Sequence, residues 1–454
     1  MDVPYVRAFV RELAPAWLDH VAILSGVAPP VRQGGFAWCD LGCGQGVTAV
    51  MLAAMHPAGE FYGIDMMPAH IDHAQRLAAE AGIANAEFHA AGFGAAAGLD
   101  LPRFDYIVAH GVYSWVSAQA RADLRCFIDR HLKPGGLVYI SYNALPGRAA
   151  DLPLQRLVRA LGESRDGNSI ERVAAALRIV NSVRELKAPA LAASLMLARI
   201  NQQTDNFAAA YLAHELLAPH WEPLCVTEVR ADMAVIGLEQ LGSATLIENY
   251  DTFVLQGVER SALADIADRD VRELVRDFFI DQAFRRDVFA RAAPSLGADD
   301  QRRLLLASAF GLTRQPSGVE YVMATRAGRV AFDNAAARGI VAALASGPRI
   351  LGEVAQTRGI DPADVVASAL VLSASGQLQP AESVRAPATD FNAVVLSRLS
   401  GSEEITYLAM PFGTGILIND AAREMLTNGN AAGEEPSWQD FLAVHGWRDW
   451  PLGS

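Results

Sequence analysis

The sequence predicts an α/β fold over the first 150 residues of this 454-residue chain, followed by a longer, mainly helical region. Two observations carry this prediction. Short apolar segments alternate with helical segments, which is typical of an open, mostly parallel sheet with helices on both faces. The segment "WCDLGCGQGVTAVML" (38–52) then places a glycine at every second position after an apolar stretch. Ligands of such sheets bind at the carboxyl ends of the strands.

Each expected element of the first part is a short run with its own pattern. Strands are expected at 36–42, 60–66, 86–92, 104–111 and 136–143. Helices are expected around 5–26 and at 47–56 and 68–82, because apolar residues recur there at helical spacing. We therefore expect one sheet-containing domain over residues 1–148.

The strand–helix alternation stops after residue 148. Helical apolar spacing marks 155–164, 169–187, 209–217 and 271–292, so residues 149–300 are expected to form a helical domain. Residues 330–380 contain two helical segments followed by "QLQP", which is a winged-helix-like order. We therefore expect a winged-helix-like C-terminal domain over residues 301–454.

The glycine turn follows a single acidic residue, Asp40. Glycine lets the main chain turn sharply and approach a ligand without a Cβ in between. A dinucleotide fingerprint would need glycine at position 47, which is Val47, and no Gly-Lys-Ser/Thr ending of a phosphate loop follows. Asp40 would repel a pyrophosphate but suits a positively charged ligand. Asp65, at the end of the next strand, can accept both hydroxyls of a ribose.

Residues 36–143 resemble the class I S-adenosylmethionine-dependent methyltransferases, which implies a Rossmann-like domain and S-adenosylmethionine as cofactor. The stretches "FDYIVAHGVYSWV" and "HLKPGGLVYIS" look like two further motifs of that family. Many members end the third strand with an acid that binds the adenine, whereas this chain has "HAAGFG", so backbone groups and Phe93 are expected to replace it. The cofactor-binding residues that the resemblance implies are Asp40, Gly42, Cys43, Gly44, Gly46, Asp65, Met66, Met67, Gly92, Phe93 and His110.

The expected catalytic residues follow the fourth strand. His110 is interpreted as a cofactor contact or a proton acceptor, with a hydrogen-bonded structural histidine as the alternative. Tyr113 is interpreted as a catalytic or pocket residue, and Trp115 as a pocket wall, with core packing as the alternative for Trp115. Tyr142 and Asn143 end the fifth strand and are expected to face the same crevice.

The helical region is similar to the methyltransferase regulatory domain found beside this catalytic domain in bacterial proteins, including rickettsial-type protein lysine methyltransferases. The similarity rests on 211–224, 237–244 and 278–291, and 391–396 and 407–418 look like the C-terminal segment of that architecture. It implies an amine acceptor such as a protein lysine. The alternatives are a small-molecule N-, O- or S-methyltransferase, and a catalytically silent protein that binds S-adenosylmethionine and acts through its interactions.

Composition excludes other classes. The net charge of −13 argues against a nonspecific nucleic-acid binder, and the would-be recognition helix begins with Asp361 and Asp364. That module is expected to serve in interaction or dimerisation, including a homodimer. The four cysteines lack metal-ligand spacing, and position 218 is Ala218, so "HELLA" is no zinc motif and no metal is expected. With no membrane-length apolar run and no signal peptide, a cytoplasmic protein with no membrane partner is expected.

Overall fold

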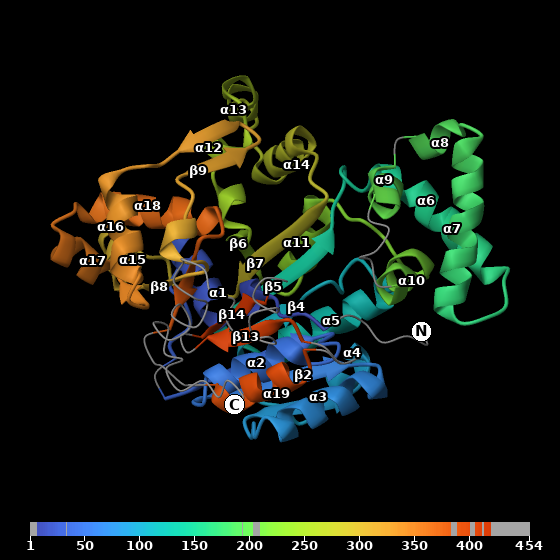
Figure 1. The fold of residues 1–454 in the computed structure, drawn as a ribbon, viewed down its shortest axis with the longest axis horizontal. Coiled ribbons are helices and arrows are strands. Elements are labelled where there is room, and N and C mark those ends of the chain that lie inside the picture. The colour runs from blue at the N-terminus through green and yellow to red at the C-terminus, as the bar shows by residue number, and fades with distance from the viewer. Residues whose placement is uncertain are drawn as a thin grey trace, which may run out of the picture.

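The computed structural model describes residues 7–32, 34–192, 194–202, 209–382, 388–399, 405–410 and 413–418 (Figure 1). Its centre is a seven-stranded sheet with the order β3-β2-β1-β4-β5-β7-β6. The strands are β1 (Phe36–Leu41), β2 (Gly59–Asp65), β3 (Ala86–Ala90), β4 (Phe104–Ala109), β5 (Leu132–Asn143), β6 (Glu239–Ser243) and β7 (Phe284–Ala290). The first five strands are mutually parallel, and β7 is antiparallel to both β5 and β6. The expected α/β fold with a mostly parallel sheet is confirmed.

The last two strands lie within residues 149–300, which were expected to form a helical domain, and the expectation of helices alone in that range is wrong. The helix predicted over 271–292 is α14 (Arg269–Ile280), which ends where Asp281 adopts φ 50°. The segment that follows alternates Arg285 and Asp287 on one side with Arg286 and Val288 on the other, and it pairs with the open edge of β5. Pairing with β5 therefore overrides the helical spacing of this segment. The sheet extends across the domain boundary expected at residue 148, because β6 and β7 lie after it.

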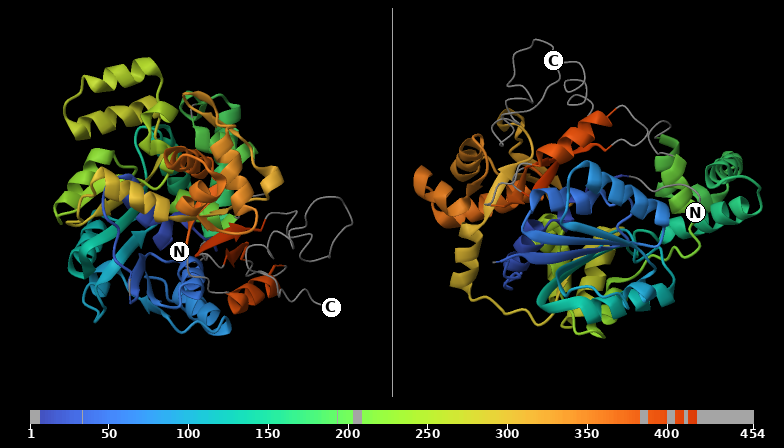
Figure 2. Two further views of the ribbon diagram at one scale, coloured as in Figure 1. Left: turned by 90° about the vertical axis from the view of Figure 1, so that its left-hand side faces the viewer. Right: turned by 90° about the horizontal axis from the view of Figure 1, so that it is seen from below.

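Helices cover both faces of the sheet, which is seen between them in the right panel of Figure 2. Alternate strand residues make two cores: Trp38 belongs to the core on one face, and Cys39 to the core on the other. The first face is covered by α1 (Pro15–Leu24), α2 (Val47–Met55) and α3 (Pro68–Glu80), and the second by α4 (Phe93–Ala96), α5 (Ala118–His131) and α11 (Val226–Ala234).

The N-terminal helix is shorter than the 5–26 expected from the sequence. Residues 1–6 lie outside the described part of the chain, and residues 11–13 form a single 3-10 turn. Helix α1 begins at Pro15. Proline is well suited to the first turn of a helix, because the backbone N–H that it lacks would have no partner within the helix at that position.

A separate helical lobe, on the right of Figure 1, follows the fifth strand. It has its own core, in which Leu154, Val173 and Leu216 are buried. Its helices are α6 (Leu152–Glu163), α7 (Ser169–Glu185), α8 (Pro189–Ala192), α9 (Leu195–Gln202) and α10 (Ala209–Leu217). Among the helices of the described ranges, none is long and apolar enough to cross a membrane.

Short elements η3 (Leu246–Asn249), α12 (Asp251–Val254) and α13 (Gly257–Ala264) connect β6 to α14. The region after β7, on the left of Figure 1, contains the two helical segments expected within 330–380, followed by a strand at "QLQP". Its three-stranded antiparallel sheet has the order β11-β8-β12. The elements are α15 (Ala298–Ala307), β8 (Ala309–Leu312), β9 (Val322–Thr325), β10 (Gly328–Ala331), α16 (Ala335–Leu344), β11 (Arg349–Ile350), α17 (Leu351–Arg358), α18 (Pro362–Ala374) and β12 (Leu378–Ala381).

The C-terminal elements return to the seven-stranded sheet. Strands β13 (Tyr407–Met410) and β14 (Thr414–Leu417) pair antiparallel, and α19 (Thr389–Ser397) precedes them. Strand β14 lies so close to α2 that a Cβ on Gly415 would be 2.2 Å from Cε of Met51. The tail is therefore packed beside the helix that starts at the glycine turn.

A partly buried ion network also joins these parts. Arg32 lies 2.8 Å from Asp19 on α1 and 2.5 Å from Glu382, just after β12. Asp19 accepts a 2.6 Å hydrogen bond from the hydroxyl of Tyr106 on β4. One guanidinium thus holds the N-terminal helix, the large sheet and the C-terminal region together.

Candidate functional site

The site lies where the strand order reverses. Strands β1 and β4 are neighbours, with Asp40 level with Val108, although β2 and β3 lie between them in sequence. Their helical connections leave in opposite directions from this point, so the carboxyl ends of β1 and β4 border a crevice. The glycine turn follows β1 and His110 follows β4, which brings the two ends of the predicted site together.

The glycine turn has the backbone that its sequence predicts. Gly42, Gly44 and Gly46 all have positive φ, at 87°, 53° and 74°. A Cβ on Gly42 would be 2.4 Å from the side chain of Val112, whereas a Cβ on Gly44 would have no protein atom within 4 Å. The turn is therefore tightly packed at its base and bare at Gly44, where a ligand can approach the main chain.

Asp65 joins the end of β2 to the glycine turn. Its Oδ2 accepts a hydrogen bond from the backbone N–H of Gly44 at 3.0 Å, and its Oδ1 accepts one from that of Met67 at 2.9 Å. Nδ1 of His70 lies 3.2 Å from the same Oδ1. A carboxylate has about four acceptor positions, so Asp65 can still accept hydroxyl groups of a ligand.

Asp40 is buried with an unused oxygen. Its side chain is in the core below the turn, and Oδ1 has no hydrogen-bond partner among the described residues. Burial, together with the nearby carboxylate of Asp65, raises the pKa of Asp40 to about 8. A positively charged ligand group would favour the ionised form. Asp40, Asp65 and the bare Gly44 thus fit a ligand that carries positive charge and neighbouring hydroxyls, as S-adenosylmethionine does.

The other expected cofactor residues lie around the same strand ends. Met66 is 76% exposed, and Met67 is the N-cap of α3. Gly92 is the N-cap of α4, where a Cβ would meet no protein atom within 4 Å, and Phe93 is partly buried beside it. Cys43 lies within the turn itself, with its Sγ 3.6 Å from the carbonyl of Gly44. Their roles in binding the adenine and the methionine part stay predictions.

His110 is held by the fifth strand. Its Nδ1 lies 2.9 Å from the hydroxyl of Tyr139 and 3.2 Å from that of Ser141. Burial and the guanidinium of Arg286 lower the pKa of His110 to about 4, against an opposing effect of Glu12. His110 is therefore neutral near pH 7 and a weak base.

A cavity of about 860 Å³ lies beside His110. The segments that line it come from the N-terminus, β7, the residues after β8, and the hairpin of β13 and β14. The N-terminal segment is fixed by Thr48 on α2, whose hydroxyl accepts from Val10 N at 3.2 Å and donates to the carbonyl of Ala8 at 3.3 Å. His110, at the end of β4, thus lines a pocket whose other walls come from distant parts of the chain.

Two charged groups of this cavity were not expected from the sequence. Glu12 lines it from the N-terminal segment, where it also forms a 3.2 Å ion pair with Arg11. Arg286 lines it from β7; its Nη1 donates to Thr245 Oγ1 at 3.0 Å, and its Nε is buried without a partner among the described residues. The sequence gives no strand signal for Arg286, because "FRRDVFA" does not alternate polar and apolar residues, and only the pairing with β5 fixes the face on which Arg286 lies. No local signal identifies Glu12.

Tyr113, interpreted as a catalytic or pocket residue, and Tyr142, expected to face the crevice, do not line the cavity beside His110. Tyr113 is fully buried, and its hydroxyl donates to Asp232 on α11 at 2.6 Å. Tyr142 is buried in the same core, and its hydroxyl donates to Asp287 at 2.6 Å. Side chains alternate along a strand, so Tyr142 points to the face opposite Tyr139 and Ser141, which hold His110.

Trp115 stacks on Trp221, with ring centroids 5.8 Å apart and planes at 27°. Asn143 is buried, and its main chain is bonded to Ser114: the Asn143 N–H donates to Ser114 Oγ at 2.9 Å. Neither Trp115 nor Asn143 lines the cavity beside His110, so their substrate roles stay predictions.

Within the described ranges, no group of three or more His, Cys, Asp or Glu side chains is arranged to hold a metal ion.

Comparison with protein families gives two matches. Residues 33–181 match a family described as a methyltransferase domain. Residues 208–291 match a family described as a predicted methyltransferase regulatory domain. The second match ends at Arg291, directly after β7, and therefore includes both strands that complete the sheet.

One relative matches over nearly the whole chain, and another over about a third of it. An uncharacterized protein of Synechocystis sp. is 33% identical over 429 residues, which cover 92% of this chain and 85% of the relative. An uncharacterized protein of Rickettsia prowazekii is 34% identical over 149 residues, or 32% of this chain and 26% of the relative. Among solved structures, PKMT2 from Rickettsia typhi in complex with AdoHcy has a TM-score of 0.67 at 19% identity, covering 93% of this chain and 88% of that one.

Proposed function

Because the chain belongs to the class I S-adenosylmethionine-dependent methyltransferases that carry a methyltransferase regulatory domain, we propose that it methylates the side-chain amine of a protein lysine. When bound, S-adenosylmethionine supplies an electrophilic methyl group on a sulfonium. We assign its ribose to Asp65, its positive charge to Asp40 and its close main-chain contact to Gly44. The acceptor enters from the cavity beside His110.

The observation that carries this proposal is the pair of opposite charges beside His110. Arg286 and Glu12 both line the cavity, and both act on the pKa of His110. An amine attacks a methyl group only in its neutral form, so the site must lower the pKa of the amine or take up its proton. Arg286, which lowers the pKa of His110, favours the neutral form of an amine in the same way.

Glu12 is assigned to the amine itself. Its carboxylate can accept a hydrogen bond from the amine N–H, which orients the nitrogen lone pair toward the methyl group. We also assign Glu12 as the proton acceptor, because transfer to a neutral amine gives a methylated ammonium that must lose one proton, and the Glu12 carboxylate lines the same cavity. Neutral His110 adds no positive charge that would repel an incoming ammonium group.

The aromatic lining suits a long alkyl-amine side chain. Phe9 and Tyr407 both line the cavity, with ring centroids 6.0 Å apart and planes at 56°. Aromatic faces attract ammonium groups and pack against methylene chains. The fold likeness to PKMT2 from Rickettsia typhi covers 93% of this chain, and a protein lysine is the acceptor that the family resemblance implies. A volume of about 860 Å³ also lies within the range of small-molecule sites, which keeps a small acceptor as the alternative.

Label transfer tests the proposal. The purified chain is incubated with S-adenosylmethionine labelled on the methyl group, and either the protein fraction or the low-molecular-weight filtrate of a bacterial extract. We expect label in protein, recovered as methyl-lysine after acid hydrolysis. Label found only in the filtrate would replace the protein acceptor by a small molecule. If neither fraction is labelled although the cofactor binds, the chain is a silent binding protein.

The cofactor assignment has its own control. An Asp65→Ala variant should transfer label to neither fraction, since it loses the ribose contact and the bond to Gly44. An Asp72→Ala variant, altered at an exposed position of the adjacent α3, should label as the unaltered chain does.

A further inference from the structure

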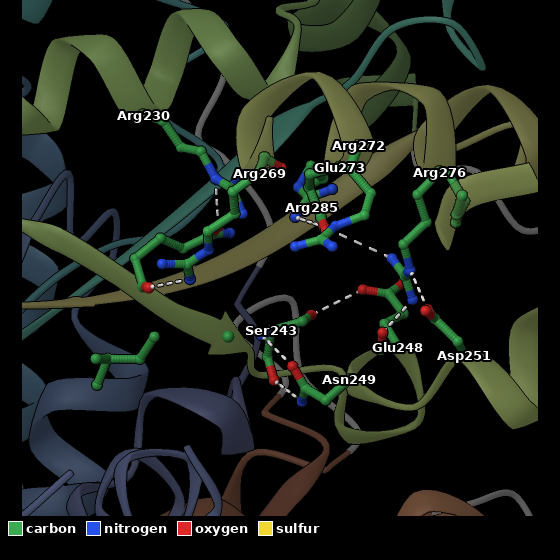
Figure 3. A pocket seen from close by; sticks show the side chains of 14 residues that line it. Arg230, Ser243, Glu248, Asn249, Asp251, Arg269, Arg272, Glu273, Arg276 and Arg285 are labelled. Atoms are coloured by element: carbon green, nitrogen blue, oxygen red, sulfur yellow. Dashed lines mark hydrogen bonds and ion pairs between the residues drawn. The ribbon is translucent and has the colours of Figure 1, made fainter. Parts of the chain in front are cut away.

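A second pocket, of about 270 Å³, lies among α11, α14, β6 and β7. Figure 3 shows its arginine side chains along one side, with Ser243, Glu248, Asn249 and Asp251 on the other. We propose that this pocket binds a small ligand through an oxyanion, a phosphate or carboxylate group. The arginines that line it are Arg230, Arg269, Arg272, Arg276 and Arg285.

Three of these arginines are fixed in place by carboxylates. Arg285 is buried and lies 2.9 Å from Glu273 and 3.0 Å from Asp287. Arg276 is buried 2.8 Å from Asp251, and Arg230 lies 2.7 Å from Asp270. These ion pairs order the walls of the pocket, because a buried guanidinium held by carboxylates has little rotational freedom left.

Two arginines have no carboxylate partner. Among the described residues, neither Arg269 nor Arg272 forms an ion pair, and one N–H of Arg269 donates to the carbonyl of Gln240 at 3.1 Å. They are three residues apart in the first turn of α14, so both lie on the pocket side of that helix. Their remaining N–H groups form a pair of planar forks, the geometry that binds a phosphate or carboxylate with two hydrogen bonds.

The acidic residues of the lining are already engaged. Asp251 pairs with Arg276, and Glu273 pairs with Arg285. Burial by itself would raise the pKa of Glu273, but the guanidiniums of Arg285 and Arg276 outweigh burial and lower it. Glu248 accepts from Ser243 Oγ at 2.7 Å and from Gln282 Nε2 at 3.1 Å. The hydrogen-bonding capacity left in the pocket is therefore mainly that of N–H donors, which selects an acceptor-rich anion.

The volume limits the ligand. A pocket of about 270 Å³ is smaller than the sites that enclose drug-sized molecules, which start at about 300 Å³. A phosphate or carboxylate on a short carbon chain fits this space. Such a ligand would touch the strand that carries the methyl-transfer cavity, because Arg285 lines this pocket and the next residue, Arg286, lines the other.

Anion titration tests the proposal without any need for a methyl acceptor. The full chain is titrated with inorganic phosphate, malonate or chloride at equal ionic strength, and binding is followed by calorimetry and by the thermal unfolding midpoint. We expect saturable binding of phosphate or malonate with no equivalent for chloride. Phosphate binding alone assigns a phosphorylated ligand, and malonate binding alone assigns a carboxylate. Equal, non-saturating effects of all three anions would overturn the proposal.

Variants locate the binding. Arg269→Gln with Arg272→Gln should weaken anion binding about tenfold for each arginine removed. Both positions are exposed and unpaired, so the variant should fold and still bind S-adenosylmethionine. Arg302→Gln, on exposed α15 outside the pocket, is the matched control and should bind the anion unchanged. Undiminished binding in the double variant would show that the anion binds elsewhere and would overturn the assignment.

Discussion

The carboxylate of Asp65 accepts a hydrogen bond from the backbone N–H of Gly44 at 3.0 Å. The residue that ends β2 is thereby tied to the turn that ends β1, and the two halves of the cofactor site are held in one geometry. The bond leaves acceptor capacity on Asp65 for a ribose, so the side chain that orders the turn is also the one that we propose to bind the ligand.

Removal of this carboxylate should weaken cofactor binding. We expect Asp65→Ala to lower the affinity for S-adenosylmethionine about 10- to 100-fold, because it removes charge-assisted hydrogen bonds to the ribose and to the turn. Calorimetry measures this directly, with Asp72→Ala on the exposed side of α3 as the control. An unchanged affinity in Asp65→Ala would contradict the cofactor site proposed for it.

Asp40 should make cofactor binding depend on pH. Its pKa is raised to about 8 by burial and by Asp65, so it is protonated at neutral pH in the free protein. A positively charged cofactor favours the ionised form, and binding then releases the proton. Affinity should therefore rise with pH up to about 8 and level off above it. Calorimetry in buffers of different ionisation enthalpy counts the proton, and Asp40→Asn should abolish the release while keeping the shape of the side chain.

Glu12 should affect transfer but not cofactor binding. With the acceptor identified by label transfer, Glu12→Gln should lower kcat/KM about 100-fold, since the amide cannot take up the proton of the amine. The affinity for S-adenosylmethionine should stay the same. Glu163→Gln, at an exposed ion pair on α6, is the control. A variant at Glu12 with the activity of the unaltered chain would show that the carboxylate does not act on the acceptor.

Arg32 should contribute strongly to stability. Arg32→Ala leaves the buried carboxylate of Asp19 and the partly buried carboxylate of Glu382 without their guanidinium. We expect the free energy of unfolding to fall by about 3–5 kcal/mol, as when one partner of a buried ion pair is removed. Denaturant unfolding followed by tryptophan fluorescence measures the change. Arg302→Ala, at a solvent-exposed pair, should change it by less than about 1 kcal/mol.

His20 should make the fold sensitive to acid. Both of its ring nitrogens are buried without partners among the described residues, and burial lowers its pKa from 6.5 to about 4. Between these two values the unfolded chain binds a proton that the folded chain does not. Stability should therefore fall as pH decreases from 6.5 to about 4, by an amount on the order of 3 kcal/mol. In the His20→Leu variant the free energy of unfolding should depend less on pH between 6.5 and 4. An equally steep loss of stability in the variant would assign the pH dependence to other groups, such as His110.

Local patterns predicted the first five strands well and the last two not at all. The strand expected at 104–111 is β4, Phe104–Ala109, because a short apolar run between turn signals has one stable arrangement in an α/β sheet. Residues 284–290 also fit the helical spacing of the segment before them, and only pairing with the edge of β5 makes them a strand. A local pattern cannot show that a sheet edge is open.

In the candidate site, too, the residues with a local sequence signal were predicted and those that depend on strand orientation were not. Asp40, Gly44 and Asp65 were identified because the glycine turn and the strand that follows it are local features of the chain. Tyr142 was expected on the wrong face, because the sequence does not show which of two successive strand residues points to the crevice. The hydroxyl of Tyr142 bonds to Asp287 instead, and Tyr139, three residues earlier, is the tyrosine that contacts His110.

The sequence by itself determined the α/β fold and the cofactor, and it predicted the residues proposed to bind that cofactor, since each depends on residue types at short fixed spacing. Only the tertiary structure decided the acceptor end and the arginine pocket. Glu12, His110, Arg286 and Tyr407 line one cavity although they are far apart in the chain. Strand alternation then assigns Arg285 to one pocket and Arg286 to the other. Both outcomes depend on which strands pair across the sheet, and that pairing is a long-range property.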